Sequence, residues 1–439
     1  MRARFAVDMG RHVHAVMVLV LVVACGPGAG APVTPGPSVT PTLRGEGGQF
    51  AAIEGANVLA RGARIVSPDV THEQLVELTA ANSAFALDLY RELANASDDN
   101  ILLGPHSIST ALAMIYAGAR GQTATDMARV LHFGAFESDV AARFNALDFA
   151  LLARQQPGVV DLRLANQAFS QPGLALVDSY LETLSTQFGA PLAELDFADA
   201  ERARDVINDW VSGQTNERIP ELFPSGTIDG NTRLVLVNAI SLDATWSYLF
   251  DPAQTTDEKF TLADGTAVNV PSMHFDLKLP LAFEPDYSAV ELMYGPGDLS
   301  MVLVLPKDSS RFDQSVDPAM LEEIFDRISE NGIHLSLPKF SFKRHLDMDQ
   351  ILVELGMGSA YGGDFSGMVE GGGLFLDTVQ HDAFIEVDEA GTEAHAATGG
   401  AMAASHGPGI EFNRPFFFVI RDRITGAILF LGRVSDPRG

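Results

Sequence analysis

Apolar residues recur at helical spacing early in the chain and form short unbroken runs later. Phe85, Leu89 and Leu93 are four residues apart, which predicts an amphipathic helix. Residues 108–116 (ISTALAMIY) are apolar on nearly every side and predict a buried helix. Residues 234–240 (LVLVNAI) are apolar at successive positions, which is typical of a central strand covered on both faces.

Further elements follow from the same patterns. Residues 205–211 predict a helix, and Thr123 to Asp126 (TATD) matches a capping box at a helix start. Short apolar runs predict strands at residues 301–305, 334–337, 416–420 and 428–431. Helices that dominate early and strands that dominate late predict an α+β fold.

The longest apolar run lies near the N-terminus, from Ala15 to Ala24 (AVMVLVLVVA). It is too short for a transmembrane helix, which needs about 20 residues. Arg2, Arg4 and Arg11 precede it, and a basic segment before a short apolar stretch is typical of a secretory signal.

The run ends in Val22-Val23-Ala24-Cys25, which resembles a bacterial lipobox. In that motif the cysteine thiol is acylated and the cysteine becomes the new N-terminus. We therefore expect residues 1–24 to be a lipoprotein signal peptide and Cys25, the only cysteine, to carry the lipid. The alternative is a buried cysteine after an ordinary signal.

Composition then divides the rest of the chain. Residues 26–48 contain mostly Pro, Gly, Thr and Ser, which is typical of a tether. We expect residues 25–70 to be this tether with a weakly patterned lead-in, and residues 71–437 to be one folded domain.

The charge balance excludes some partners. Acids outnumber bases 57 to 29 among 439 residues, for a formal net charge of −28. Nucleic acids and heparin-like polyanions need a basic surface, so neither is expected as a partner. One cysteine also excludes an intramolecular disulfide.

Common enzyme motifs are absent. The chain has no GxSxG, HExxH, GxGxxG or P-loop sequence, and its 11 histidines lack metal-ligand spacing. We expect no enzyme activity, no cofactor and no metal. A Ser/His/Asp triad stays open, because its members meet only in space.

The segment that follows a predicted strand at residues 384–387 combines flexibility with a strand pattern. Residues 399–410 contain four Gly and one Pro, which is typical of an exposed loop. Just before them, small residues alternate with polar ones. In an extended segment Thr392, Ala394, Ala396 and Thr398 would share one face. Such a segment is suited to enter a sheet.

These features together resemble the serpin family over residues 75 to 437. The residues that carry the resemblance, in family order, are Asn100 to Phe133, Leu236 to Ile240 with Trp246, Gly391 to Ala394, Phe412 to Phe416, and Leu429 to Val434. The resemblance implies three β-sheets, about nine helices and an exposed reactive loop between Gly391 and Phe412. It also implies a suicide inhibitor, in which a serine protease cuts the loop, forms an acyl-enzyme and is trapped as the cut loop inserts into sheet A.

The resemblance assigns roles to individual residues. Ser107, Asn238 and His381 match the polar cluster called the shutter, under the strands that part. Trp246 and Glu389 match the breach, where insertion begins. The hinge is matched by Gly391, Thr392, Ala394, Ala396 and Thr398. Gly104 departs from the pattern, since many members have Ser there.

Two ways of counting along the loop place the scissile bond at neighbouring positions. The family's common spacing, counted forward from Gly391, puts Ser405 before the bond, whereas counting back from Asn413 puts Ala404 there. The reactive residues are therefore Ala404, Ser405 and His406, with Met402 and Ala403 left open. Small residues here favour elastase-like or subtilisin-like targets over trypsin-like ones, which need Arg or Lys.

Two functions remain in competition. One is a monomeric inhibitor that binds a serine protease covalently, and the other is a non-inhibitory serpin whose loop is only cut. We expect an exported protein, held at an outer membrane or cell surface through lipidated Cys25, or alternatively secreted.

Overall fold

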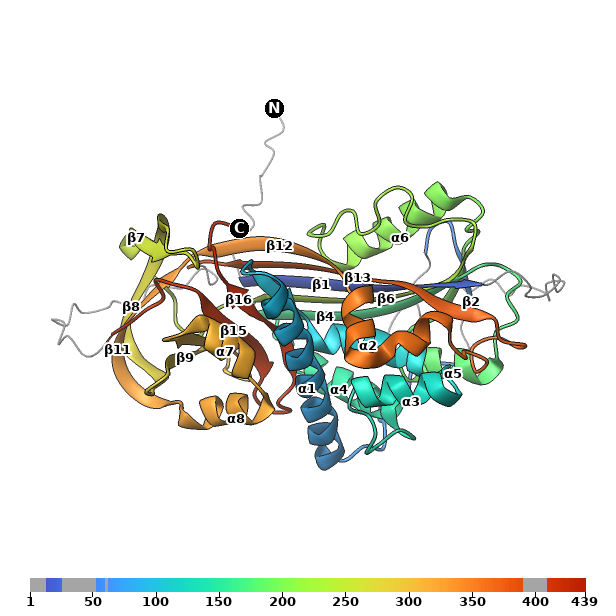
Figure 1. The fold of residues 1–439 in the computed structure, drawn as a ribbon, viewed down its shortest axis with the longest axis horizontal. Helices are drawn as coiled ribbons and strands as arrows, with labels where there is room; N and C mark the ends of the chain where they lie inside the picture. The colour runs from blue at the N-terminus through green and yellow to red at the C-terminus, as the bar shows by residue number, and fades with distance from the viewer. Residues whose placement is uncertain (1–12, 26–52, 60–61, 390–408) are drawn as a thin grey trace.

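A seven-stranded sheet spans the long axis of the computed structural model, which describes residues 13–25, 53–59, 62–389 and 409–439 (Figure 1). Its strand order is β12-β13-β1-β6-β4-β5-β2. The strands are β1 (Val13–Cys25), β2 (Asn57–Leu59), β4 (Val160–Ser170), β5 (Leu192–Glu194), β6 (Thr232–Ala244), β12 (Phe340–Asp347) and β13 (Leu374–Val387). The apolar run predicted as a central strand is part of β6.

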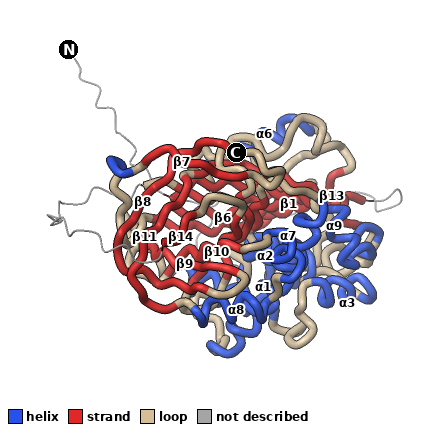
Figure 2. The backbone as a smooth tube through the Cα atoms, turned by 60° about the vertical axis from the view of Figure 1, so that its left-hand side comes forward, coloured by secondary structure: helices blue, strands red, loops and turns tan. Residues whose placement is uncertain are grey.

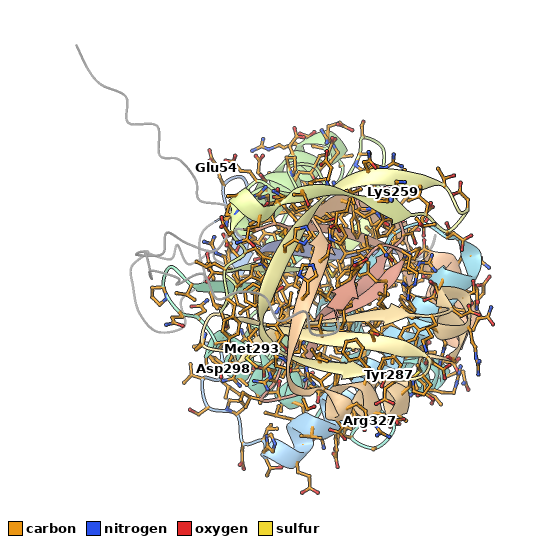
Figure 3. The ribbon with its side chains drawn as sticks, turned by 90° about the vertical axis from the view of Figure 1, so that its left-hand side faces the viewer. Glu54, Lys259, Tyr287, Met293, Asp298 and Arg327 are labelled. Carbon is orange, nitrogen blue, oxygen red and sulfur yellow. The ribbon has the colours of Figure 1, made fainter. Side chains whose placement is uncertain are left out.

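The second assembly of strands curves around one end of the molecule (Figure 2). Its order is β14-β11-β8-β9-β10-β15-β16-β3, with β7 paired to β8. The strands are β3 (Ile101–Leu103), β7 (Thr256–Thr261), β8 (Ala267–Phe283), β9 (Tyr287–Tyr294), β10 (Leu299–Pro306), β11 (Ser329–Pro338), β14 (Gly409–Glu411), β15 (Phe416–Asp422) and β16 (Ile428–Val434). Figure 3 looks onto this end, with Tyr287 and Met293 near opposite ends of β9.

The long strand β8 belongs to two parts of this assembly. Its pairing with β11 runs from Ser272 to Leu281, and its pairing with β9 involves only Leu281 to Phe283. The assembly therefore divides at the end of β8 into two sheets. With the seven-stranded sheet they make three, so the predicted α+β fold with three sheets is confirmed.

Helices cover both faces of the seven-stranded sheet (Figure 1). Nine α-helices lie within the described residues: α1 (His72–Ala96), α2 (Pro105–Tyr116), α3 (Gly121–Val130), α4 (Val140–Leu152), α5 (Asp178–Thr186), α6 (Ala200–Gln214), α7 (Ser309–Ser315), α8 (Pro318–Arg327) and α9 (Asp349–Leu352). Short turns of other helix types follow at η1 (Pro252–Gln254), η2 (Val353–Met357) and η3 (Gly358–Gly362). None of the described helices is long and apolar enough to cross a membrane.

Local sequence signals explain where two helices begin. Thr71 caps α1, and the Gln74 side chain accepts a hydrogen bond from the Thr71 backbone N–H, which completes a capping box. The capping box predicted at Thr123 is wrong, because α3 already begins at Gly121. Thr123 instead uses its hydroxyl to accept a hydrogen bond from the Asp364 backbone N–H.

Strand β1 is the unexpected element of this fold. Sequence analysis interprets residues 1–24 as an export signal, whereas in the full chain Val13–Cys25 form an interior strand of the seven-stranded sheet, between β13 and β6. β1 pairs antiparallel with β13, from His14 opposite Glu386 to Cys25 opposite Leu374, and antiparallel with β6 on its other edge. An apolar run of this length is compatible with both structures, because each requires continuous hydrophobicity.

The two faces of β1 pack into different cores. Ala15, Met17, Leu19, Leu21 and Val23 lie in the large core with α1 and α2, and the valines at positions 16, 18, 20 and 22 lie in a smaller core with α6. The side chains from residue 15 to residue 24 are at most 4% exposed. Complete burial of a Val, Leu or Met side chain contributes about 1.5–3 kcal/mol, so the strand is held strongly.

Candidate functional site

A buried polar network lies under the centre of the seven-stranded sheet. Ser107, on α2, donates a short hydrogen bond to Asn238 on β6. Asn238 in turn donates to Asn166 on β4 at 2.7 Å, and Asn166 donates to the Phe188 carbonyl at 2.8 Å. The structure therefore brings together two of the three residues assigned to the shutter, and adds Asn166.

The third assigned residue, His381, stands apart from this network. It lies on β13, and Leu19 of β1 is opposite both His381 on one side and Asn238 on the other. Among the described residues neither ring nitrogen of His381 has a hydrogen-bond partner, and the side chain is fully buried. Burial, together with the nearby His345, lowers the pKa of His381 to about 3.

The pKa of His381 predicts an acid-sensitive step in the stability of the full chain. The unfolded state, where the pKa is near 6.5, binds a proton at higher pH than the folded state does. Stability is therefore complete above pH 6.5 and falls as the pH is lowered toward 3, by up to about 1.4 kcal/mol per pH unit. Urea unfolding from pH 7.5 to pH 5 should show a shallower loss for His381→Leu than for the wild type.

The control for this measurement is His72→Gln, at the exposed start of α1. That variant should keep the wild-type pH dependence. Equal slopes for His381→Leu and the wild type would contradict the assignment of a neutral, buried His381.

The residues assigned to the breach, Trp246 and Glu389, lie near the end of β13, where the described chain stops. Trp246 stacks on Tyr294 with 4.5 Å between ring centroids, and its indole N–H donates to the Asp388 carbonyl at 3.1 Å. Glu389 accepts hydrogen bonds from Lys339 at 2.6 Å and from Thr255 at 2.5 Å. Burial opposes ionisation of Glu389, but these two bonds outweigh it and hold its pKa below the usual range.

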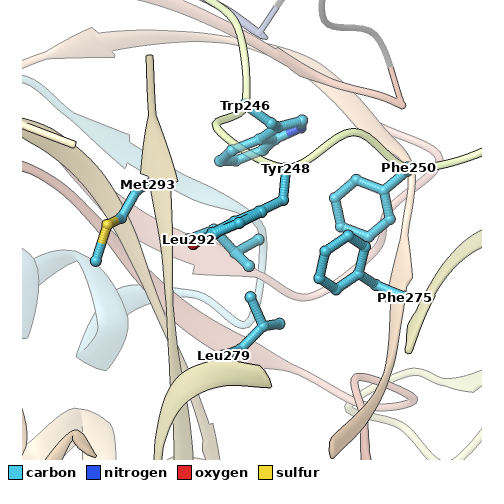
Figure 4. A pocket seen from close by; sticks show the side chains of 7 residues that line it. All are labelled: Trp246, Tyr248, Phe250, Phe275, Leu279, Leu292 and Met293. Atoms are coloured by element: carbon cyan, nitrogen blue, oxygen red, sulfur yellow. The ribbon is translucent and has the colours of Figure 1, made fainter. Parts of the chain in front are cut away.

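A small apolar hollow adjoins Trp246 (Figure 4). Its lining residues are Trp246, Tyr248, Phe250, Phe275, Leu279, Leu292 and Met293. Tyr248 is 45% exposed, so the hollow opens to solvent beside the breach. Within the described residues no three His, Cys, Asp or Glu side chains are grouped as metal ligands.

Most of the predicted loop lies outside the described residues. This holds for Gly391, Thr392, Ala394, Ala396, Thr398, Ala404, Ser405 and His406. The described chain stops at Glu389 and resumes at β14, which pairs in parallel with β11 from Gly409 opposite His334. The strands β13 and β14, which flank residues 390–408, therefore lie in different sheets.

Sequence reasoning missed the partners of the assigned residues. Lys339, Thr255 and Asn166 are separated from them by 50 to 134 positions along the chain, so no local motif marks them. Gly104 carried a signal, because it stands where many serpins have Ser. A Cβ atom built on Gly104 would lie 1.6 Å from the Met17 sulfur, so this glycine leaves room for β1.

Comparison with known protein families identifies the family of this chain. Residues 80–437 match the family model described as "Serpin (serine protease inhibitor)". The chain belongs to the serpin family. The predicted family and fold are thereby confirmed, and the seven-stranded sheet is called sheet A from here on.

Relatives of this serpin cover the same region. Leukocyte elastase inhibitor A of Mus musculus is 37% identical over 380 residues, which span 82% of this chain and all of the relative. An uncharacterized serpin-like protein of Thermococcus kodakarensis is 38% identical over 371 residues, covering 82% of this chain and 85% of the relative. Among solved structures, uncleaved ovalbumin aligns with a TM-score of 0.75 at 26% identity, over 82% of this chain and 100% of ovalbumin.

Proposed function

We propose that this serpin inhibits serine proteases by a suicide reaction. The protease serine attacks the carbonyl carbon before the scissile bond, and the amine of the following residue takes a proton and leaves. The loop then remains attached to the protease as an ester. Its cut end inserts into sheet A before water hydrolyses that ester, and the protease is trapped.

The main support for this proposal is that sheet A has room for one further strand between β6 and β13. Between β6 and β13 the sheet holds a complete antiparallel strand of 13 residues, with both of its faces buried. The place into which a cut loop must insert therefore has the length, pairing edges and packing that a strand needs. The small residues at alternate positions 392 to 398 suit the same place, and relatives carry the name leukocyte elastase inhibitor.

A non-inhibitory role is the second candidate. One structural neighbour, with a TM-score of 0.73 and 29% identity, is thyroxine-binding globulin in complex with thyroxine, so the fold also serves proteins named for binding. In that case the loop of this chain would only be a substrate. The absence of bulky or charged residues at 392, 394, 396 and 398 favours the inhibitor.

Incubation with proteases separates the two candidates. We expect a chain that starts at residue 25, with Cys25→Ser, to form a covalent, SDS-stable adduct with elastase or subtilisin but none with trypsin. The residues around the proposed bond are small, and Arg414 lies beyond the loop, where it donates to the Pro306 carbonyl. Cleavage by elastase without an adduct would favour the non-inhibitory role.

Mass spectrometry of the released peptide locates the bond. Cleavage after Ser405 frees residues 406–439, and cleavage after Ala404 frees residues 405–439. A peptide that starts outside residues 403–407, or stable inhibition of trypsin, would contradict the proposed alignment of the loop.

We further propose that the mature protein is anchored to a membrane through lipidated Cys25. Once residues 1–24 are removed, the acyl chains would be its hydrophobic anchor. Cys25→Ser should move the protein from the membrane fraction to the soluble fraction of the expressing cells. The matched control is Gly26→Ala, which keeps the cysteine, and equal solubility of Cys25→Ser and the wild type would contradict the anchor.

A further inference from the structure

Strand β1 already pairs with the facing edges of β6 and β13, the two strands between which the cut loop must insert. β1 pairs continuously with β13 through residues 374–386 and with β6 through residues 232–244. A backbone edge in a sheet pairs with one strand at a time. While β1 is in place, neither β6 nor β13 has a free edge at the centre of the sheet.

The loop would need the same place in the same direction. It leaves directly after β13, so an inserted loop must turn back and run antiparallel to β13, as β1 does. The N-terminal end of β1 lies at the breach, where His14 is opposite Glu386 and Val13 is opposite Ala244. The first loop residues to insert would therefore meet the start of β1.

The domain is shaped around β1 at one position in particular. Met17 is completely buried, and its sulfur fills the space where a side chain on Gly104 would lie, 1.6 Å from the Cβ site. The backbone of Gly104 has φ −119°, which any residue adopts, so conformation alone does not require glycine there. The absence of a side chain is explained by Met17.

Gly104 accommodates β1, whereas the residues assigned to the shutter are separated by it. Leu19 separates His381 from Asn238, and the buried ring of His381 is left without a hydrogen-bond partner among the described residues. An unpartnered buried polar group is unfavourable. Departure of β1 removes the residue that stands between His381 and Asn238.

From these observations we infer that residues 13–25 act as an internal blocking strand in the unprocessed chain. This inference rests on the proposed inhibitory function. With β1 in sheet A, a protease that cuts the loop finds no place for it to insert, so the precursor is a substrate. Removal of residues 1–24 takes the strand away and makes the chain an inhibitor, which couples activity to processing at Ala24.

The test compares three chains against elastase: the full chain, the chain from residue 25 with Cys25→Ser, and the full chain with Gly104→Ser. The processed chain should form the adduct, and the full chain should form at least tenfold less. Gly104→Ser should partly restore the adduct in the full chain, since its side chain forces the flexible Met17 side chain out of its buried position. Adding Met17→Ala to Gly104→Ser should reduce the adduct again.

Two controls exclude effects on the domain itself. Gly104→Ser in the processed chain should leave adduct formation unchanged, because Met17 is absent there. Val18→Asp in the full chain should also restore the adduct. It places a charge in the core under α6 but leaves residues 71–437 untouched.

Hydrogen–deuterium exchange measures, without a protease, whether residues 13–25 occupy the place between β6 and β13. Amides of residues 13–25 should be protected in the full chain, and amides of β6 and β13 should exchange faster in the processed chain. Free exchange of residues 13–25, or equal adduct formation by the full and processed chains, would overturn the inference. If neither chain forms an adduct but residues 13–25 are protected, strand occupancy is upheld and the proposed inhibition is what fails.

Discussion

Thr392→Arg, made in the chain that starts at residue 25 with Cys25→Ser, is expected to be cut by elastase while forming almost no covalent adduct. Insertion of the loop would carry position 392 into sheet A between β6 and β13. β1 shows what that environment is, because its side chains from 15 to 24 are buried on both faces. An unpaired guanidinium placed there costs several kcal/mol, which slows insertion so that water hydrolyses the acyl-enzyme first.

Gly407→Arg is the matched control for this prediction. Position 407 follows the proposed scissile bond, so it stays on the C-terminal fragment and does not enter sheet A when the cut loop inserts. This variant adds the same side chain to the same loop and should retain most of the adduct. The measurement is the ratio of adduct to cleaved serpin on a denaturing gel. Undiminished adduct from Thr392→Arg would argue against loop insertion in this chain.

Elements with a strong local pattern were predictable from the sequence. The apolar helix at residues 108–116 is part of α2, whose residues from Pro105 to Ile115 are all buried. The central strand at residues 234–240 is part of β6. Both predictions succeed because an element buried on every side needs an unbroken apolar run. Such a run can be seen in the sequence without knowing which elements pack against it.

Strand β1 could not be predicted in this way. A run such as Ala15–Ala24 satisfies the requirement for an export signal and for a central strand equally well. The basic residues before it and Cys25 after it favoured the signal. Which structure forms depends on whether the edges of β6 and β13, more than 200 residues away, are available when the segment reaches them.

The candidate site was predictable only in part, for a similar reason. Ser107, Asn238 and Trp246 could be assigned because each lies in a segment that resembles the serpin family. The contacts that define their roles are tertiary. Glu389 is held by Lys339 and Thr255, which lie in connections between other elements, and Gly104 is explained only by the sulfur of Met17.

Cleavage of the reactive loop is expected to raise the melting temperature of the processed chain sharply. Insertion would add hydrogen bonds to both β6 and β13, each with a net contribution of about 0.5–1.5 kcal/mol. About ten such bonds would stabilise the protein by about 10 kcal/mol. At roughly 2 °C per kcal/mol for a large domain, the melting temperature should rise by about 20 °C.

The full chain is the control that gives this measurement its meaning. Its sheet A already contains β1, so cleavage of the same loop should leave its melting temperature nearly unchanged. Before cleavage the full chain should also melt above the processed chain, since β1 contributes pairing on both edges and buried side chains on both faces. Thermal unfolding followed by circular dichroism, before and after elastase, gives all four values. An unchanged melting temperature for the cleaved processed chain would favour the non-inhibitory role, because a loop that is cut but does not insert adds no strand to sheet A.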